Sequence, residues 1–259
     1  MKKLICIPIL FIFHSHAICQ DKTPGYKLPA SFRFDYEVVQ MNIDKKKSAD
    51  SAEMHWYYDK DGQYGALKVV KGKSPSDNDN FVVFDKEGTM IIFDQGKKSV
   101  VIMRLRKLMG DFGAAAAKDS SGHMHRDTDK KEKYSSVKTG KTKNIAGYPA
   151  EEYLVTDDKG KKGFVWYAKV DFNPQTIFGF AADAMKERSA NNPFMRALTA
   201  PNSLLAEVDS EEDGRAFYTK SISKKTLSMP TQGYAVQDFS NMNLKEMIQE
   251  EMKKKKEKQ

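Results

Sequence analysis

The sequence predicts an α+β domain: a curved antiparallel β-sheet, shaped as a half-open barrel of roughly nine to eleven strands, covered by a central helix and followed by a C-terminal helix. Two observations lead to this fold class. Short runs of alternating apolar and polar residues, divided by turn-forming residues, fill residues 31–105 and resume after residue 133. One stretch with apolar residues at helical spacing, residues 173–190, interrupts the second set of strands.

The first half of the domain predicts an antiparallel meander. In residues 31–42, apolar side chains alternate with charged ones from Phe32 to Val38, which is typical of a half-buried strand. β-Branched and aromatic runs between short polar turns predict the strands that follow, which are residues 54–58, 64–70, 80–85, 89–94 and 99–105.

The second half resumes the strand pattern after an interruption. Residues 109–133 contain an alanine run and then a hydrophilic stretch without periodicity. This predicts a mobile insertion within a single domain of residues 31–240. The later predicted strands are residues 134–137, 151–155, 164–170, 204–208 and 216–227.

Two helices are predicted from capping signals. Asn173 and Pro174 suit the N-cap and the first helical position, and an apolar stripe continues to Arg188. In residues 241–259, Asn243 precedes an acidic residue as in a capping box, ahead of a basic tail. We therefore expect the first helix to cover the sheet and the second to fray into the tail.

The N-terminus has the pattern of a secretory signal peptide. Two lysines precede an apolar run at residues 4–13, and small side chains lead to a cleavage point after Cys19. The apolar run is shorter than the about 18 residues of a membrane anchor, and the bulky Ile18 disfavours lipoprotein processing at Cys19. Residues 1–19 therefore predict export, to the periplasm or out of the cell, with residues 20–30 as a leader to the domain.

Both cysteines, Cys6 and Cys19, lie in this predicted signal peptide. Processing after Cys19 would leave a chain without thiols, although export would permit disulfides. The exported chain would therefore have no thiol catalysis and no cysteine-ligated zinc. Its stability would come from packing.

The chain carries a formal net charge of +8, and lysines cluster at residues 45–47, 159–162 and 253–258. Such runs suit contact with an anionic envelope surface, or they are simply solvated loops and a solvated tail. No aromatic residues alternate with the lysines as in a groove for single-stranded nucleic acid. We therefore expect no nucleic-acid partner.

Few residues suggest a cofactor or a reaction. His123 and His125 are the densest set of candidate metal ligands, but they fall in the predicted mobile insertion. Residues 140–142 match only the end of a phosphate-binding loop, because the earlier glycine of that motif is missing. His55 has no nucleophile-elbow motif beside it, which argues against a serine hydrolase, whereas a glycosidase-type carboxylate pair stays open. We expect no cofactor and no enzymatic activity.

Aromatic side chains are the candidate ligand-binding residues. On the predicted sheet and its covering helix they would line an apolar space suited to an acyl chain or another apolar ligand. Alternatively, the same residues fill a dry core. The candidate ligand-binding residues are Phe32, Phe34, Tyr36, Trp56, Tyr58, Trp166 and Phe178.

Three short motifs resemble a known family. Residues 139–153 contain a basic turn, the sequence Ile-Ala-Gly-Tyr and an aromatic strand; Gly-Phe-Val-Trp-Tyr follows at residues 163–167, and Met-Pro-Thr-Gln-Gly-Tyr at residues 229–234. Together they resemble the secreted bacterial domain of unknown function 4412, which is distantly similar to the lipoprotein-carrier fold of the bacterial envelope. The resemblance implies a half-open antiparallel barrel over helices with an apolar cavity. It implies no catalytic residue.

Export, the aromatic strand faces and this resemblance lead to one principal hypothesis. The protein is expected to be a non-enzymatic envelope protein that binds a lipid or another apolar ligand between its sheet and its helix. One alternative is an interaction module that uses the basic tail and the mobile insertion at the outer-membrane surface. A hydrolase is the other.

Overall fold

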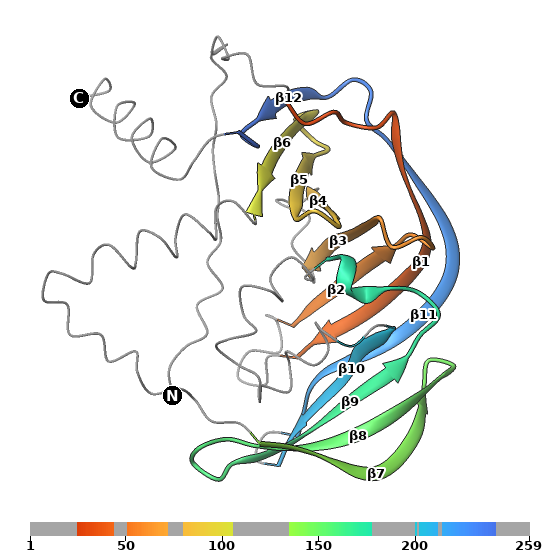
Figure 1. The fold of residues 1–259 in the computed structure, drawn as a ribbon, viewed down its shortest axis with the longest axis vertical. Helices are drawn as coiled ribbons and strands as arrows, with labels where there is room; N and C mark the ends of the chain where they lie inside the picture. Colours follow the sequence, from red (N-terminus) through yellow and green to blue (C-terminus); the bar gives the residue numbers. More distant parts are fainter. Residues whose placement is uncertain are drawn as a thin grey trace, which may run out of the picture.

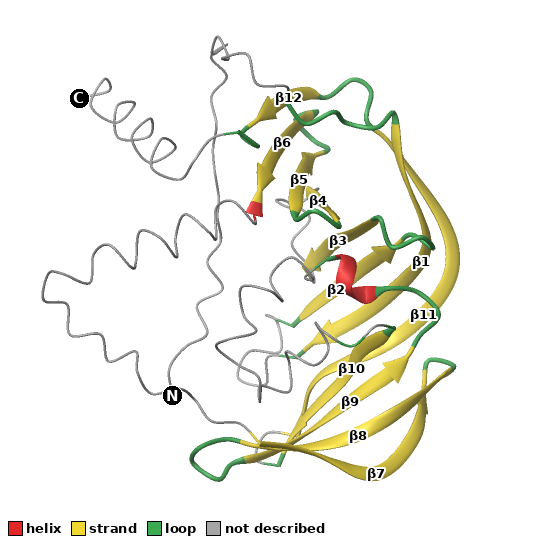
Figure 2. Cartoon of the chain, in the orientation of Figure 1, coloured by secondary structure: helices red, strands yellow, loops and turns green. Residues whose placement is uncertain are grey.

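The computed structural model describes residues 25–43, 51–71, 80–105, 135–177, 200, 202–211 and 214–241. Within these residues, twelve strands form one hydrogen-bonded sheet (Figures 1 and 2). The strands are β1 (Ser31–Asn42), β2 (Ala52–Tyr58), β3 (Tyr64–Lys71), β4 (Asn80–Asp85), β5 (Thr89–Asp94), β6 (Ser99–Arg104), β7 (Ser135–Ile145), β8 (Tyr148–Thr156), β9 (Lys162–Lys169), β10 (Ser203–Ser210), β11 (Gly214–Pro230) and β12 (Ala235–Asp238). No helix among these residues is long and apolar enough to cross a membrane.

The sheet consists of two antiparallel meanders that meet at its centre. Strands β1 to β6 follow one another across one half and β7 to β11 across the other, so the order in space is β12-β6-β5-β4-β3-β2-β1-β11-β10-β9-β8-β7. β1 and β11 join the halves along almost their whole length. β12 pairs with β6 in parallel, because the chain crosses from the end of β11 to the far edge of the sheet (Figure 1).

The predicted α+β class was wrong, because the regular secondary structure of the described residues is almost entirely β-strand. Where the central helix was expected, a single 3-10 turn, η3 (Pro174–Thr176), follows β9 (Figure 2). The predicted cap does form, since the Asn173 side chain accepts a hydrogen bond from the backbone N–H of Gln175. A cap specifies where a helical turn begins and not how many turns follow.

Within the described residues the sheet is therefore not covered by the expected central helix, and it has more strands than predicted. The rest of the predicted central helix, the predicted C-terminal helix and the predicted insertion at residues 109–133 lie outside the described residues.

The antiparallel sheet itself is confirmed, and each of the strands β1 to β11 overlaps a run that the sequence predicts. β12 was missed because it is a strand of 4 residues with two exposed members and no alternation. β7 is far longer than the predicted residues 134–137. Most of its side chains are exposed, so its sequence lacks the apolar alternation that marks the other strands.

The sheet buries side chains on both of its faces. Along β4, Phe81 and Val83 belong to one apolar cluster, whereas Val82 and Phe84 belong to another. Successive side chains of a strand point to opposite faces, so the two clusters lie on opposite sides of the sheet. The Trp166 face is the side whose buried residues include Tyr36, Trp56, Tyr58, Phe84 and Trp166, and the opposite side is the His55 face.

On the His55 face, the start of β1 packs over β4 and β5. The Phe32 ring meets the Phe93 ring edge to face at 6.0 Å, and Phe34 meets Phe81 in the same way at 5.9 Å. All four rings are almost fully buried. The ends of β1 and β11 therefore close one half of the sheet around an apolar interior.

On the Trp166 face, the segment after β9 packs on β3. A Cβ atom at Gly65 would collide with the Ile177 side chain, so the glycine lets this segment lie directly on the strand. The Thr176 hydroxyl also donates a hydrogen bond of 3.3 Å to the carbonyl of Gly62. These contacts place Phe172 and Ile177 on the Trp166 face.

Candidate functional site

The centre of the Trp166 face is an aromatic cluster held by the segment after β9. Tyr36 of β1 and Tyr58 of β2 lie directly opposite each other in the antiparallel register. Both rings pack on Phe172, with ring centres 4.7 Å away for Tyr36 and 4.9 Å away for Tyr58. Trp56 occupies the next position of the same face, opposite Val38. Burial raises the pKa of Tyr58, so its hydroxyl stays protonated and the cluster is uncharged.

The structure divides the predicted ligand-binding residues between the two apolar clusters. Tyr36, Trp56, Tyr58 and Trp166 belong to the cluster on the Trp166 face. Phe32 and Phe34 alternate in phase with Tyr36, but they belong to the other cluster. β2 ends opposite Tyr36, and the start of β1 beyond this point packs over β4 and β5 instead.

The other predicted site residues, Phe178, His123 and His125, lie outside the described residues. Ligand binding by Phe178 and metal binding by the two histidines stay predictions. Within the part of the chain that the structure describes, no group of three or more His, Cys, Asp or Glu side chains is arranged to hold a metal ion.

Next to Trp166 the apolar face becomes charged. Glu152 of β8 and Glu207 of β10 both lie opposite Trp166 of β9, so these three side chains form one row across the strands. Glu152 is 5% exposed and Glu207 is 6% exposed. Buried carboxylates require partners, and cations from β7 and β11 supply them.

Glu207 is bound by two cations at a single oxygen atom. Its Oε1 lies 2.7 Å from Nζ of Lys143 and 3.4 Å from Nη2 of Arg215. The Lys143 ammonium also lies 4.0 Å from the centre of the Trp166 ring, which is a cation–π contact. Burial acts to raise the pKa of Glu207, but hydrogen bonds with Lys143 and Asp209 hold it below its ordinary value. Burial and the hydrogen bond with Glu207 raise the pKa of Asp209.

Glu152 has a separate set of partners on β7. The Thr139 hydroxyl donates a hydrogen bond of 2.8 Å to its Oε1, and Nζ of Lys141 lies 3.3 Å from the same atom. The register of β7 with β8 shifts between Lys138 and Thr142. This irregularity carries Thr139 and Lys141 toward Glu152 on the Trp166 face.

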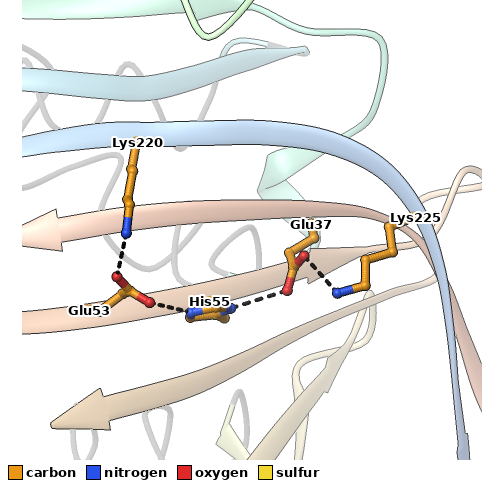
Figure 3. A network of polar contacts seen from close by, with 5 residues as sticks. All are labelled: Glu37, Glu53, His55, Lys220 and Lys225. Carbon is orange, nitrogen blue, oxygen red and sulfur yellow. Dashed lines mark hydrogen bonds and ion pairs between the residues drawn. The ribbon is translucent and has the colours of Figure 1, made fainter. Parts of the chain in front are cut away.

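The His55 face carries another group of charged side chains, termed the His55 network (Figure 3). Nδ1 of His55 lies 3.1 Å from Oε1 of Glu37, and Nε2 lies 2.8 Å from Oε1 of Glu53. The remaining oxygen of Glu37 contacts Nζ of Lys225 at 3.1 Å. The remaining oxygen of Glu53 contacts Nζ of Lys220 at 3.1 Å. The five side chains thus connect β1, β2 and β11.

The two lysines of this network lie at irregular points of β11. At each of two register shifts, β11 has one more residue than β1, and Lys225 and Lys220 lie at these shifts. The extra residues bring both lysine side chains to the His55 face, where the carboxylates of the network lie (Figure 3).

The His55 network pairs its charges with one another. Both ring nitrogens of His55 contact carboxylates, and both can donate hydrogen bonds only when the imidazole is protonated. Burial acts to raise the pKa of Glu37, but hydrogen bonds with His55 and Lys225 outweigh it and lower the value. Hydrogen bonds with His55 and Lys220 lower the pKa of Glu53. This arrangement stabilises the centre of the sheet.

The charged end of the Trp166 face was missed at the level of sequence. One usable signal was present, because Glu207 interrupts the apolar run Leu-Leu-Ala-Glu-Val of β10, and a buried acid needs a partner. The partner Lys143 is 64 residues away, on a strand whose pattern predicts only a basic turn. The sequence therefore indicates that Glu207 needs a partner, but it does not indicate which residue supplies it.

Comparisons with known proteins assign no family to this chain. A scan of protein-family models gives no match to this chain, and a search of curated protein sequences gives none either. Among solved structures, one similar chain is the crystal structure of an uncharacterized conserved protein from Thermus thermophilus, with 8% sequence identity and a TM-score of 0.38. The similarity covers 79% of this chain and 91% of that chain.

Proposed function

We propose that this chain is a non-enzymatic binding protein for an amphipathic ligand, such as a lipid, whose apolar part lies against the Trp166 face. The observation that carries this proposal is the continuity of the aromatic cluster with the charged row at Trp166. A buried apolar cluster next to a few placed polar groups is the usual lining of a small-molecule site.

Binding is favoured over catalysis by the state of the titratable groups. A general base needs a lone pair that can reach a substrate proton. Among the described residues, both nitrogens of His55 are engaged by carboxylates, and the Oε1 atom of Glu207 is held by Lys143 and Arg215. A hydrolase that used His55 or Glu207 as its base would have to break these ion pairs before reacting.

We further propose that the protein acts in the cell envelope after export, as the N-terminal pattern of residues 1–19 and the resemblance of its sequence motifs to the secreted bacterial domain of unknown function 4412 suggest. The fold is compatible with cleavage after Cys19. The first described residues contact the sheet, because the backbone N–H of Tyr26 donates a hydrogen bond of 2.7 Å to Asp238. Removal of residues 1–19 would leave that contact in place.

Tryptophan fluorescence tests the proposal directly. The chain has 2 tryptophans, Trp56 and Trp166, and both lie on the Trp166 face. Bromine atoms on an acyl chain quench a tryptophan only at close approach, so dibromostearic acid should quench the delipidated protein saturably. Unbrominated stearic acid should leave the emission largely unchanged and should reverse the quenching in competition.

Two variants locate the bound chain. W56F leaves Trp166 as the reporter, and W166F leaves Trp56; both reporters should be quenched by dibromostearic acid. Far-UV circular dichroism of each variant checks that the sheet is intact. An absence of saturable quenching in the unchanged protein would refute binding at this face, and quenching that does not compete with stearic acid would show non-specific adsorption.

A further inference from the structure

We propose that Lys143 and Arg215 form an anion-binding subsite at the charged end of the Trp166 face, which takes the carboxylate or phosphate group of the ligand. This inference rests on the proposed function and adds the chemistry of the ligand's polar end. It assigns to the ligand a negative charge that lies beside Trp166.

The subsite is built from two cations that converge on one atom. Lys143 comes from β7 and Arg215 from β11, and both contact Oε1 of Glu207. A single carboxylate oxygen therefore fixes two positive groups from distant parts of the sheet next to each other. Both groups have several N–H donors, so an anion can bind them while the contact with Glu207 persists.

Exposure decides which charge an incoming ligand meets. The Glu207 side chain is 7% exposed, whereas Lys143 is 34% exposed and Arg215 is 52% exposed. The carboxylate thus lies beneath and the cations lie toward solvent. A ligand that approaches this end encounters positive charge, and Glu207 acts as a positioning residue.

The contact distances also leave the cations open to an anion. Asp209 Oδ1 lies 3.8 Å from Nε of Arg215, and Glu207 Oε1 lies 3.4 Å from Nη2 of Arg215, so both contacts of the guanidinium are longer than the 2.7 Å contact of Lys143. The neighbouring Lys141 contacts Glu152 and belongs to a separate ion pair.

The apolar neighbour of this subsite indicates how a ligand would lie. The Lys143 ammonium sits over the Trp166 ring, and Trp166 belongs to the same buried cluster as Tyr58 and Phe172. An amphipathic molecule with its anionic group on Lys143 would direct its apolar part along this cluster. A carboxylate and a phosphate share the required chemistry, and a free phosphate ion is the other source of such an anion.

Matched ligands and variants test the subsite. Dibromostearic acid and dibromostearyl alcohol differ in the charge of the polar end, so tryptophan quenching compares an anionic with a neutral ligand on the same protein. We expect the acid to bind about tenfold more tightly than the alcohol. K143Q and R215Q should each abolish most of this preference while the affinity for the alcohol stays unchanged.

The controls are K97Q and R33Q, which remove the same charges from exposed ion pairs with Asp94 and Asp35. Both should bind the acid as the unchanged protein does. Inorganic phosphate then separates the sources of the anion. Displacement of the acid by phosphate at millimolar concentration supports a subsite for a free ion, and failure of phosphate to compete supports a subsite that needs a tethered apolar chain.

The remaining outcomes count against the anion subsite alone or against both the subsite and the proposed function. Equal affinity for acid and alcohol would overturn the anion subsite and leave the proposed function standing. An equal loss of affinity for the acid and the alcohol in K143Q and R215Q would also overturn the anion subsite, because the cations would then act only in folding. Binding of neither ligand to the unchanged protein would overturn both the proposed function and the subsite.

Discussion

The two charged clusters of the sheet use similar residues in opposite ways. In the His55 network acidic and basic side chains alternate along one line, from Lys225 through Glu37, His55 and Glu53 to Lys220 (Figure 3). At the charged end of the Trp166 face, two cations meet at a single oxygen of Glu207. Alternation gives each carboxylate oxygen of the line its own partner, whereas convergence places two cations on one carboxylate oxygen beside an apolar cluster.

This difference separates a structural cluster from a candidate binding cluster. A line of alternating charges leaves each group paired with its neighbours and offers little to a ligand. A buried carboxylate beneath two more exposed cations holds those cations in place and still leaves them accessible. The number of ion pairs is therefore a poor guide to function here, and their geometry is a better one.

The largest expected effect is the loss of the shared carboxylate. E207Q keeps the shape of the side chain but removes the charge that holds Lys143 and Arg215, so it should lower the free energy of unfolding by about 2 kcal/mol. This loss of free energy is smaller than the loss for a fully buried pair, because both cations are partly exposed to water. E37Q should cost only about 1 kcal/mol, since His55 keeps its contact with Glu53. Urea unfolding at neutral pH measures both values.

The control for these two variants is E211Q, which changes an exposed glutamate at the end of β10. It should alter the free energy of unfolding by less than about 0.5 kcal/mol. If E37Q proved more destabilising than E207Q, the His55 network would be the tighter of the two clusters and the comparison would reverse.

The sequence predicts the strands far better than it predicts the fold class or the two clusters. Alternation is a local property, so the run that begins at Phe32 correctly indicates β1. Which neighbours each face meets is not local. Phe34 and Tyr36 have the same side-chain phase and lie in different cores, because β2 ends opposite Tyr36.

The sequence does not predict the two charged clusters, because their contacts also depend on distant strands. Glu53 and His55 are close in sequence, but the lysines of the network reach them through bulges of β11 that no sequence pattern marks. The contact of Lys143 with Glu207 depends on the long, exposed strand β7. The signal at Asn173 correctly predicts where a helical turn begins, but it does not predict how many turns follow.

Acidification should affect the contributions of Glu37 and Asp209 with opposite signs. The pKa of Glu37 is lowered in the folded protein, so its stabilising contribution is complete above the ordinary value and is lost as the pH falls through the folded value. The pKa of Asp209 is raised, so its ionised form destabilises the fold above the folded value, and this penalty disappears in acid. D209N should therefore raise the free energy of unfolding at neutral pH by about 0.5–1 kcal/mol.

Urea unfolding from about pH 7 to about pH 3 checks these signs. E37Q should be less stable than the unchanged protein at neutral pH, and D209N should be more stable. Both differences should shrink toward acid, where the carboxylates of the unchanged protein become protonated. A D209N variant that is destabilised as much as E37Q at neutral pH would contradict this sign and would show that Asp209 acts as an ionised partner of Arg215.

The smallest expected effects are those of the outer lysines of the His55 network. Lys220 is 60% exposed and Lys225 is 59% exposed, so each ion pair exchanges with water and is screened by salt. K220Q and K225Q should each lower the free energy of unfolding by about 0.3 kcal/mol at low salt. Raising the ionic strength to about 0.5 M should remove most of that difference. A loss several times larger that persists in salt would mean that the lysines hold the bulges of β11 in place, and the network would then be a determinant of strand register rather than a solvated pairing of charges.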